Sequence, residues 1–261
     1  MKELRGKHAL ITGASRGIGR QLVIDLASEG MSCALVSRNA AELAETQKAL
    51  QNPERHICLT CNVGEYSQVR EMVKEVRERF GPIDLLVNNA GLSRYYYFLD
   101  TPLEDMELLM QTNYWGMVYC TRELLPDMLK RRSGHIVNIS SIAGRIGTMR
   151  HTVYSASKFA VSGFSESLYY ELLGTGVHVT VVNPGVIQTH LFDHESFSDF
   201  PASSKAMMKP PTLVSRAIIK AIRKDKVEVT VPSSLWAGVV IKSIWPPLFR
   251  RLHAAYLKKA H

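Results

Sequence analysis

The residues of this sequence best suited to acid–base chemistry are a tyrosine and a lysine four positions apart, Tyr154 and Lys158. They open a segment with helical periodicity, and side chains four positions apart project from the same face of a helix. A free phenol titrates near ~10, and a cation within ~4–6 Å lowers the pKa of such an acid by roughly one to three units. The spacing predicts a proton donor or acceptor near neutral pH. The alternative is an ordinary surface pair.

A second candidate is a hydroxyl at the end of a buried strand. Residues 135–140 form an apolar run, at whose end stand two serines, Ser140 and Ser141. In open parallel sheets, ligands bind beyond the carboxyl ends of the strands. Ser141 is therefore placed to donate a hydrogen bond to a substrate carbonyl. The alternative role for a single serine is a helix cap or a turn residue.

A glycine-rich turn near the start has the composition of a phosphate-binding loop. Residues 12–19 read Thr-Gly-Ala-Ser-Arg-Gly-Ile-Gly and stand between an apolar run and a helical segment. The glycines, Gly13, Gly17 and Gly19, allow a tight turn and close approach to a pyrophosphate, which the free N–H groups of a helix N-terminus attract. The turn predicts a dinucleotide site.

The end of the second apolar run favours one dinucleotide over the other. NAD-binding folds place an acid there, about twenty residues past the glycines, to hold the ribose hydroxyls. This sequence has Ser37 and Arg38 instead, and Arg16 in the glycine-rich turn is a second cation. A guanidinium matches a phosphate by a bidentate fork, so the sequence predicts NADP(H) rather than NAD(H). The alternative is that Arg38 is a solvated loop residue.

Seven short apolar runs must position these residues. They lie at 8–12, 32–37, 56–61, 83–88, 135–140, 177–182 and 227–231, with helical segments between them. Such runs are typical of strands buried on both faces, and parallel strands need helical crossovers. We expect an α/β fold with a doubly wound, Rossmann-type parallel sheet of about seven strands, in a single domain over residues 1–261.

Six motifs in register resemble the short-chain dehydrogenases/reductases of the Tyr-x-x-x-Lys type. They are Thr12-Gly-x-x-x-Gly-x-Gly19, Asn88-Asn-Ala-Gly91, Asn113, Ser141, Tyr154-x-x-x-Lys158, and Asn183-Pro-Gly185 with Thr189. The resemblance covers about residues 6–189. It implies hydride transfer between the C4 atom of a nicotinamide and a carbonyl or alcohol carbon.

The resemblance also implies roles for four catalytic residues. Tyr154 is the general acid or base, and Lys158 lowers its pKa and holds the nicotinamide ribose. Ser141 orients the substrate oxygen, and the family's usual separation from the tyrosine selects it over Ser140. Asn113 holds a water molecule in a proton relay.

Further residues are implied to bind the cofactor. Asn89 and Gly91 line the adenosine ribose, and Val186 and Thr189 contact the carboxamide. Asn62, before Val63, departs from the family, which usually has an Asp there to hold the adenine amino group, but an amide oxygen also accepts. The full cofactor set is Gly13, Ser15, Arg16, Gly17, Ile18, Gly19, Arg38, Asn62, Val63, Asn89, Gly91, Tyr154, Lys158, Pro184, Gly185, Val186 and Thr189.

Composition limits the class of protein. A chain of 261 residues that is 46% hydrophobic and 21% charged is not disordered, collagen-like or a coiled coil. Its four cysteines are too few for a disulfide scaffold, and no signal-peptide core precedes the glycine-rich turn, so we expect a cytoplasmic setting. We expect no metal site, because Cys58 and Cys61 would point to opposite faces of a strand.

The net charge is compatible with several kinds of partner and does not distinguish among them. The formal charge of +8 could attract nucleic acid, anionic lipid or a phosphorylated cofactor. We expect no nucleic-acid binding, since many of the cations lie near the predicted cofactor phosphates or in the C-terminal segment. The aromatic run 94–98 is interpreted as a wall of the substrate pocket, or otherwise as a cover for the core.

Two segments depart from the strand–helix alternation. Residues 191–211 mix turn formers with Phe and Met, which favours a mobile substrate loop over an apolar pocket. In 235–261 a basic amphipathic pattern predicts peripheral membrane contact, with a lid over the active site or a subunit contact as the alternative. That pattern places Trp245, Leu248, Phe249, Leu252 and Tyr256 at helical spacing and carries Lys242, Arg250, Arg251, Lys258 and Lys259.

These observations favour an NADP(H)-dependent oxidoreductase that reduces the ketone of a hydrophobic substrate, such as a fatty-acyl, sphingoid or steroid-like compound. The alternative is a catalytically silent NADP(H)-binding protein of the same fold, regulatory or membrane-associated. By analogy with the family, we expect a homodimer or homotetramer formed through helices at about 103–130 and 153–173.

Overall fold

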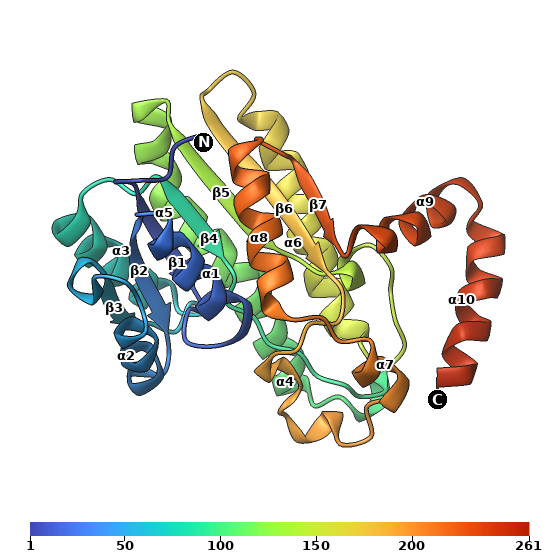
Figure 1. The fold of residues 1–261 in the computed structure, drawn as a ribbon. Coiled ribbons are helices and arrows are strands. Elements are labelled where there is room, and N and C mark those ends of the chain that lie inside the picture. Colours follow the sequence, from blue (N-terminus) through green and yellow to red (C-terminus); the bar gives the residue numbers. More distant parts are fainter. Residues whose placement is uncertain (261) are drawn as a thin grey trace.

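The computed structural model describes residues 1–260, with the backbone alone at 256 and 258–260. Its centre is a single parallel sheet in the order β3-β2-β1-β4-β5-β6-β7 (Figure 1). The predicted doubly wound fold and its seven strands are confirmed. The strands are β1 (His8–Thr12), β2 (Ser32–Ser37), β3 (Ile57–Thr60), β4 (Leu85–Asn88), β5 (Gly134–Ile139), β6 (Val177–Pro184) and β7 (Glu228–Val231).

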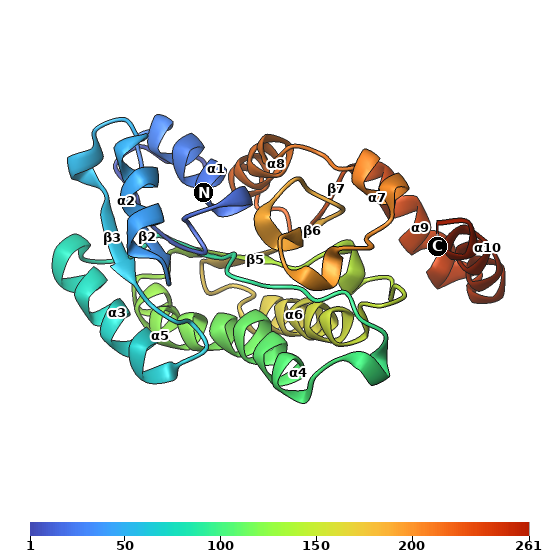
Figure 2. The ribbon, with the colours of Figure 1, turned by 90° about the horizontal axis from the view of Figure 1, so that it is seen from below.

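Helices cover both faces of the sheet (Figure 2). One layer holds α1 (Gly17–Ser28), α2 (Ala40–Lys48) and α8 (Pro211–Arg223), and the other holds α3 (Tyr66–Phe80), α5 (Gly116–Arg131) and α6 (Thr152–Glu171). Because successive strand residues point to opposite faces, Ile11 packs in the first layer and Leu10 in the second. Cys58 and Cys61 likewise pack in opposite layers, as predicted.

The strand order reverses beside β1, which pairs with β2 on one side and with β4 on the other. In a doubly wound sheet, a crevice forms at this switch point, outside the carboxyl ends of the strands. The glycine-rich turn leaves β1 there, and residues 89–91 leave β4 beside it. The fold therefore brings two motifs that are far apart in sequence to one edge.

The segment 191–211 contains short helices joined by turns and irregular chain. The helices are η5 (His190–Phe192), η6 (Glu195–Phe197) and α7 (Ala202–Ala206). Phe197 and Phe200 are buried against Tyr95, at ring-centroid distances of 5.6 and 5.1 Å. The sequence did not predict this packing, because the partner Tyr95 comes from another part of the chain. Backbone hydrogen bonds from Lys209 to Val186 and from Gln188 to Lys209 close the base of the segment.

Asn113 lies on a short irregular helix, and Ser141 is the N-cap of another, where its hydroxyl accepts from the backbone N–H of Ala143 at 3.1 Å. A π-helical turn, η3 (Gln111–Trp115), interrupts the helix between α4 (Leu103–Met110) and α5 and carries Asn113. Such turns often mark functional sites. The remaining short helices are η1 (Pro53–Arg55), η2 (Phe98–Asp100), η4 (Ile142–Gly144) and η7 (Ser233–Leu235).

The C-terminal segment forms two helices at one end of the molecule, beyond β7 (Figure 1). They are α9 (Trp236–Ile244) and α10 (Pro246–Ala260), and the proline pair begins the second helix. Ile244 and Trp245 at the joint are 78% and 62% exposed. None of the described helices is long and apolar enough to cross a bilayer. The predicted side chains of Tyr256, Lys258 and Lys259 lie outside the described residues.

Candidate active site

A cavity of about 930 Å³ opens at the carboxyl ends of the strands and joins the glycine-rich turn to the Tyr154 region. Two of the predicted site residues, Gly19 and Asn113, do not line it. The other predicted site residues line it: Gly13, Ser15, Arg16, Gly17, Ile18, Arg38, Asn62, Val63, Asn89, Gly91, Ser141, Tyr154, Lys158, Pro184, Gly185, Val186 and Thr189. Motifs spread over about 175 positions of the sequence therefore share one site.

The glycine-rich turn has the shape that a pyrophosphate requires. Gly13 has a φ of +64°, and a Cβ atom there would lie 2.9 Å from the Cα of Ala90. A Cβ on Gly19 would lie 2.1 Å from the carbonyl oxygen of Gly13, so this glycine permits close packing and does not face a ligand. Among the described residues no side chain caps the N-terminus of α1, which leaves its first N–H groups free for an anion. The turn fits the dinucleotide predicted for it.

Asn89 holds the glycine-rich turn in place. Its Nδ2 atom donates to the carbonyl oxygens of Thr12 and Gly13, both at 3.0 Å. The Thr12 hydroxyl accepts from the backbone N–H groups of Asn89 and Ala90, at 3.0 Å each. The side chain of Asn89 therefore joins β1 to β4, besides lining the cavity where the ribose was expected.

Asn62 keeps an acceptor at the predicted adenine position. Its Oδ1 atom accepts from the backbone N–H of Gly64 at 3.2 Å, and its own backbone N–H donates to Gln68. A carbonyl oxygen has two lone pairs, so this local turn leaves one for a ligand. Asn62 and Val63 both line the cavity.

Ser141, Tyr154 and Lys158 converge on the opposite part of the cavity. The Ser141 hydroxyl hydrogen bonds to Tyr154 and donates to the carbonyl oxygen of Pro184 at 3.4 Å. Ser140 is turned away, since its hydroxyl donates to the backbone carbonyl of Lys158 at 2.9 Å. Of the two serines, the structure places Ser141 beside the tyrosine.

The pKa values at this site differ from the expectation. Burial raises the pKa of Tyr154, which is 9% exposed, and its hydrogen bond with Ser141 opposes that rise. The Nζ atom of Lys158 donates to the carbonyl oxygen of Ile139 at 3.0 Å and lies 5.8 Å from the tyrosine ring centre, and its role in lowering the pKa of Tyr154 stays a prediction. Burial lowers the pKa of Lys158 to about 8, so the ammonium form still predominates at pH 7.

Asn113 is buried next to the cavity and holds neighbouring chain segments by hydrogen bonds. Its amide accepts from the backbone N–H of Leu92 at 2.9 Å and donates to the Leu92 carbonyl at 3.0 Å and to Ser157 at 3.0 Å. A Cβ atom on Gly91 would lie 3.2 Å from Asn113 Oδ1 and 3.4 Å from Lys158 Nζ. Asn113 thus fixes the chain at Leu92 next to Lys158, and the water-holding role stays a prediction.

The aromatic run 94–98 is a wall of the cavity only at its first residue. Arg94 lines the cavity and pairs with Asp105 at 2.9 Å. Tyr95 is buried in the cluster with Phe197 and Phe200, while Tyr97 and Phe98 face solvent. The pocket-wall interpretation is therefore wrong for most of the run, because Tyr95 packs against the aromatic side chains of the 191–211 segment.

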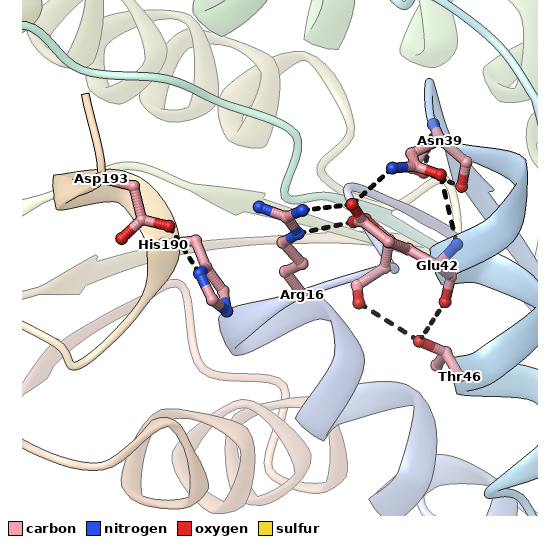
Figure 3. A network of polar contacts seen from close by, with 8 residues as sticks. Arg16, Asn39, Glu42, Thr46, His190 and Asp193 are labelled. Atoms are coloured by element: carbon pink, nitrogen blue, oxygen red, sulfur yellow. Dashed lines mark hydrogen bonds and ion pairs between the residues drawn. The ribbon is translucent and has the colours of Figure 1, made fainter. Parts of the chain in front are cut away.

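Among the cavity residues that the sequence did not single out are His151 and Glu42. His151 lies with its ring centre 5.5 Å from that of Tyr154, and burial lowers its pKa to about 4. Its position three residues before Tyr154 was the available signal. Glu42, on the first turn of α2, forms an ion pair with Arg16 (Figure 3). No local pattern joins these two residues, which are 26 positions apart.

The family model for short chain dehydrogenases matches residues 7–198, about three quarters of the chain. The chain belongs to the short-chain dehydrogenase family. It is accordingly an oxidoreductase that acts on C–OH or C=O groups with a nicotinamide cofactor.

Relatives and solved structures agree with this assignment. A ketoacyl reductase of Nostoc is 37% identical over 88% of this chain and 80% of its own length. A 3-ketodihydrosphingosine reductase of Bos taurus is 34% identical over 92% and 75%. A short-chain dehydrogenase/reductase of Burkholderia phymatum, solved in complex with NAD, superimposes with a TM-score of 0.86 at 27% identity, over 95% of this chain and 96% of that one.

Proposed function

We propose that this oxidoreductase uses NADP(H) and reduces the ketone of a hydrophobic, long-chain substrate. The observation that carries the proposal is the single cavity in which Ser141, Tyr154 and Lys158 meet an arginine at the end of β2, Arg38, where an acid would favour NAD(H). The names of two relatives, a ketoacyl reductase and a 3-ketodihydrosphingosine reductase, support a 3-keto compound with an aliphatic chain.

The residues divide the chemistry among them. Tyr154 donates the proton that the carbonyl oxygen gains on reduction, and Ser141 orients that oxygen by a hydrogen bond. Lys158, protonated at pH 7, places a positive charge beside the site where negative charge develops. The nicotinamide, when bound, supplies the hydride. Asn113 holds the chain at Leu92, and the neighbouring Gly91 lies beside Lys158.

An apolar wall favours a hydrophobic substrate. Leu92, Ile142, Phe192 and Phe200 line the same cavity as Tyr154. Phe192 and Phe200 belong to the 191–211 segment, and their ring centres lie 5.2 Å apart. We propose this segment as the substrate-binding part of the protein, because its aromatic rings can bury an aliphatic chain.

A ketone screen tests the proposed function. NADPH oxidation would be followed with 3-oxoacyl thioesters, 3-ketodihydrosphingosine and a 3-ketosteroid as substrates, each also with NADH. We expect turnover with at least one long-chain ketone and a higher kcat/KM with NADPH. Cofactor binding without turnover on any of these ketones would instead support the catalytically silent alternative.

The proposed oligomer rests on exposed apolar side chains. Trp115 on η3, Phe159 and Tyr170 on α6, and Leu173 beyond α6 are each at least 41% exposed. Helices α5 and α6 cover one face of the sheet, and α4 lies beside α6 (Figure 2). A dimer or tetramer formed through them would remove these side chains from water. Sedimentation analysis would determine the assembly.

We also propose that α9 and α10 make peripheral contact with an anionic membrane, where a hydrophobic substrate would be dissolved. Trp236, Ile241, Ile244, Trp245 and Leu252 are exposed on these helices, and Arg250 and Arg251 are exposed on α10. No acid follows Glu228 in the sequence. Exposed aromatic and basic side chains together are typical of helices that lie in a membrane interface.

Liposome flotation tests the membrane contact. The full chain should float with vesicles that contain phosphatidylserine at low salt, and a chain ending at Lys242 should stay in solution while it still binds NADPH. Each basic residue near such a surface contributes about 1 kcal/mol, so the Arg250→Gln/Arg251→Gln variant should float less. If the full chain does not bind these vesicles, helices α9 and α10 form a lid or a subunit contact.

A further inference from the structure

One carboxylate lies inside the cofactor cavity, on the same wall as the predicted phosphate-binding arginines. Glu42 lines the cavity together with Arg16 and Arg38. The Nε atom of Arg16 donates to Glu42 Oε2 at 2.6 Å, and its Nη2 atom donates to Oε1 (Figure 3). The guanidinium thus uses two donors on an internal carboxylate, the bidentate arrangement by which arginine also holds a phosphate.

Several other groups hold the Glu42 carboxylate in this place. Asn39, the N-cap of α2, accepts from the backbone N–H of Glu42 and donates its own amide to the carboxylate (Figure 3). The Ser15 hydroxyl also hydrogen bonds to Glu42, and together with Arg16 it lowers the pKa of the carboxyl group. Glu42 is therefore a fixed negative charge at the glycine-rich turn.

Arg38 differs from Arg16 in its ion pairing. Within residues 1–260, no ion pair joins Arg38 to another side chain, and its side chain is exposed at the cavity. Of the two arginines expected to hold a 2′-phosphate, one is free and the other is neutralised by the protein itself.

We propose that Glu42 is a specificity-determining residue, which competes with the 2′-phosphate of NADP(H) for Arg16 and so limits the preference for NADP(H) over NAD(H). This inference rests on the proposed use of NADP(H). A phosphate that approaches Arg16 must displace the carboxylate or stay near a like charge, and either costs binding free energy. NAD(H) carries a hydroxyl group at the same position and meets no such repulsion.

Cofactor dissociation constants measured by calorimetry test the proposal without any turnover. We expect Glu42→Gln, which has nearly the same shape, to bind NADPH at least about threefold more tightly than the wild type, because an exposed to half-buried charge pair has an effect of this order. NADH affinity should stay the same or fall, because a carboxylate accepts from a ribose hydroxyl better than an amide does. The gain for NADPH should shrink at high salt.

The matched control is Glu45→Gln. Glu45 lies on the same helix, is exposed to solvent and does not line the cavity, so this variant removes the same charge and should leave both dissociation constants unchanged. Thermal melts of Glu42→Gln and Glu42→Ala would show that both variants fold, and both should tighten NADPH.

Other outcomes would overturn the inference. If Glu42→Gln weakens NADPH, the carboxylate positions Arg16 for the phosphate and does not compete for it. If NADPH and NADH tighten equally, Glu42 acts on the whole dinucleotide and not on the 2′-phosphate. A wild type that binds NADH more tightly than NADPH would contradict the proposed cofactor instead, which is a separate result from the effect of the substitution.

Discussion

Replacing Tyr154 with Phe is expected to lower kcat about 100-fold or more while the protein still binds NADPH, because general acid catalysis typically contributes a factor of this size. The substitution removes only the hydroxyl, and the ring that packs beside His151 and Val153 stays. The measurement is a steady-state rate on the ketone identified in the screen, together with the NADPH dissociation constant of the same preparation.

A control separates lost chemistry from lost structure at this position. Tyr114→Phe removes a hydroxyl from another tyrosine, one that is outside the cavity and contacts Trp115 and Phe164 through its ring. It should keep the wild-type rate. If Tyr154→Phe retains more than about a tenth of the wild-type kcat, Tyr154 is not the general acid.

Replacing Arg38 with Asp is expected to raise the NADPH dissociation constant at least about tenfold and to leave NADH binding little changed or improved. A charge-assisted contact with the 2′-phosphate becomes a repulsion between like charges. Because no ion pair holds Arg38 within the described chain, the substitution leaves no other side chain without its partner. Titration of both cofactors against the variant checks this expectation.

The control for Arg38 is an arginine with the same exposure outside the site. Arg55→Asp makes an identical change in net charge at an exposed position in η1, away from the cavity. It should leave both affinities unchanged. Equal losses of NADPH and NADH in Arg38→Asp would mean that the substitution damages the site as a whole, and the assignment of Arg38 to the phosphate would then be wrong.

Pattern in the sequence, together with the family resemblance, was enough to determine the fold and to place seventeen residues in the lining of the cavity. The strands follow from apolar runs that are buried on both faces, since such runs have no other stable placement in a parallel sheet. The predicted run 32–37 coincides with β2, and the prediction for 177–182 falls two residues short of the end of β6 at Pro184. The spacing of Tyr154 and Lys158 required one face of one helix, and α6 provides it.

The state of each side chain was decided by tertiary contacts. Arg16 was predicted as a second cation for the cofactor phosphate, yet it pairs with a carboxylate on the next helix. Tyr95 was placed in the cavity wall, yet the 191–211 segment buries it. The pKa of Tyr154 was expected to fall, but burial raises it.

These three features share one physical reason. Propensity and periodicity act over a few residues, so the sequence alone determines which elements form and which residues share a face. Ion pairing, aromatic packing and desolvation depend on which surfaces meet after the chain has folded, and the pairs Arg16–Glu42 and Tyr95–Phe197 join positions that no local pattern connects. The sequence therefore determined where the chemistry lies, and the tertiary structure decided how each group is charged and held.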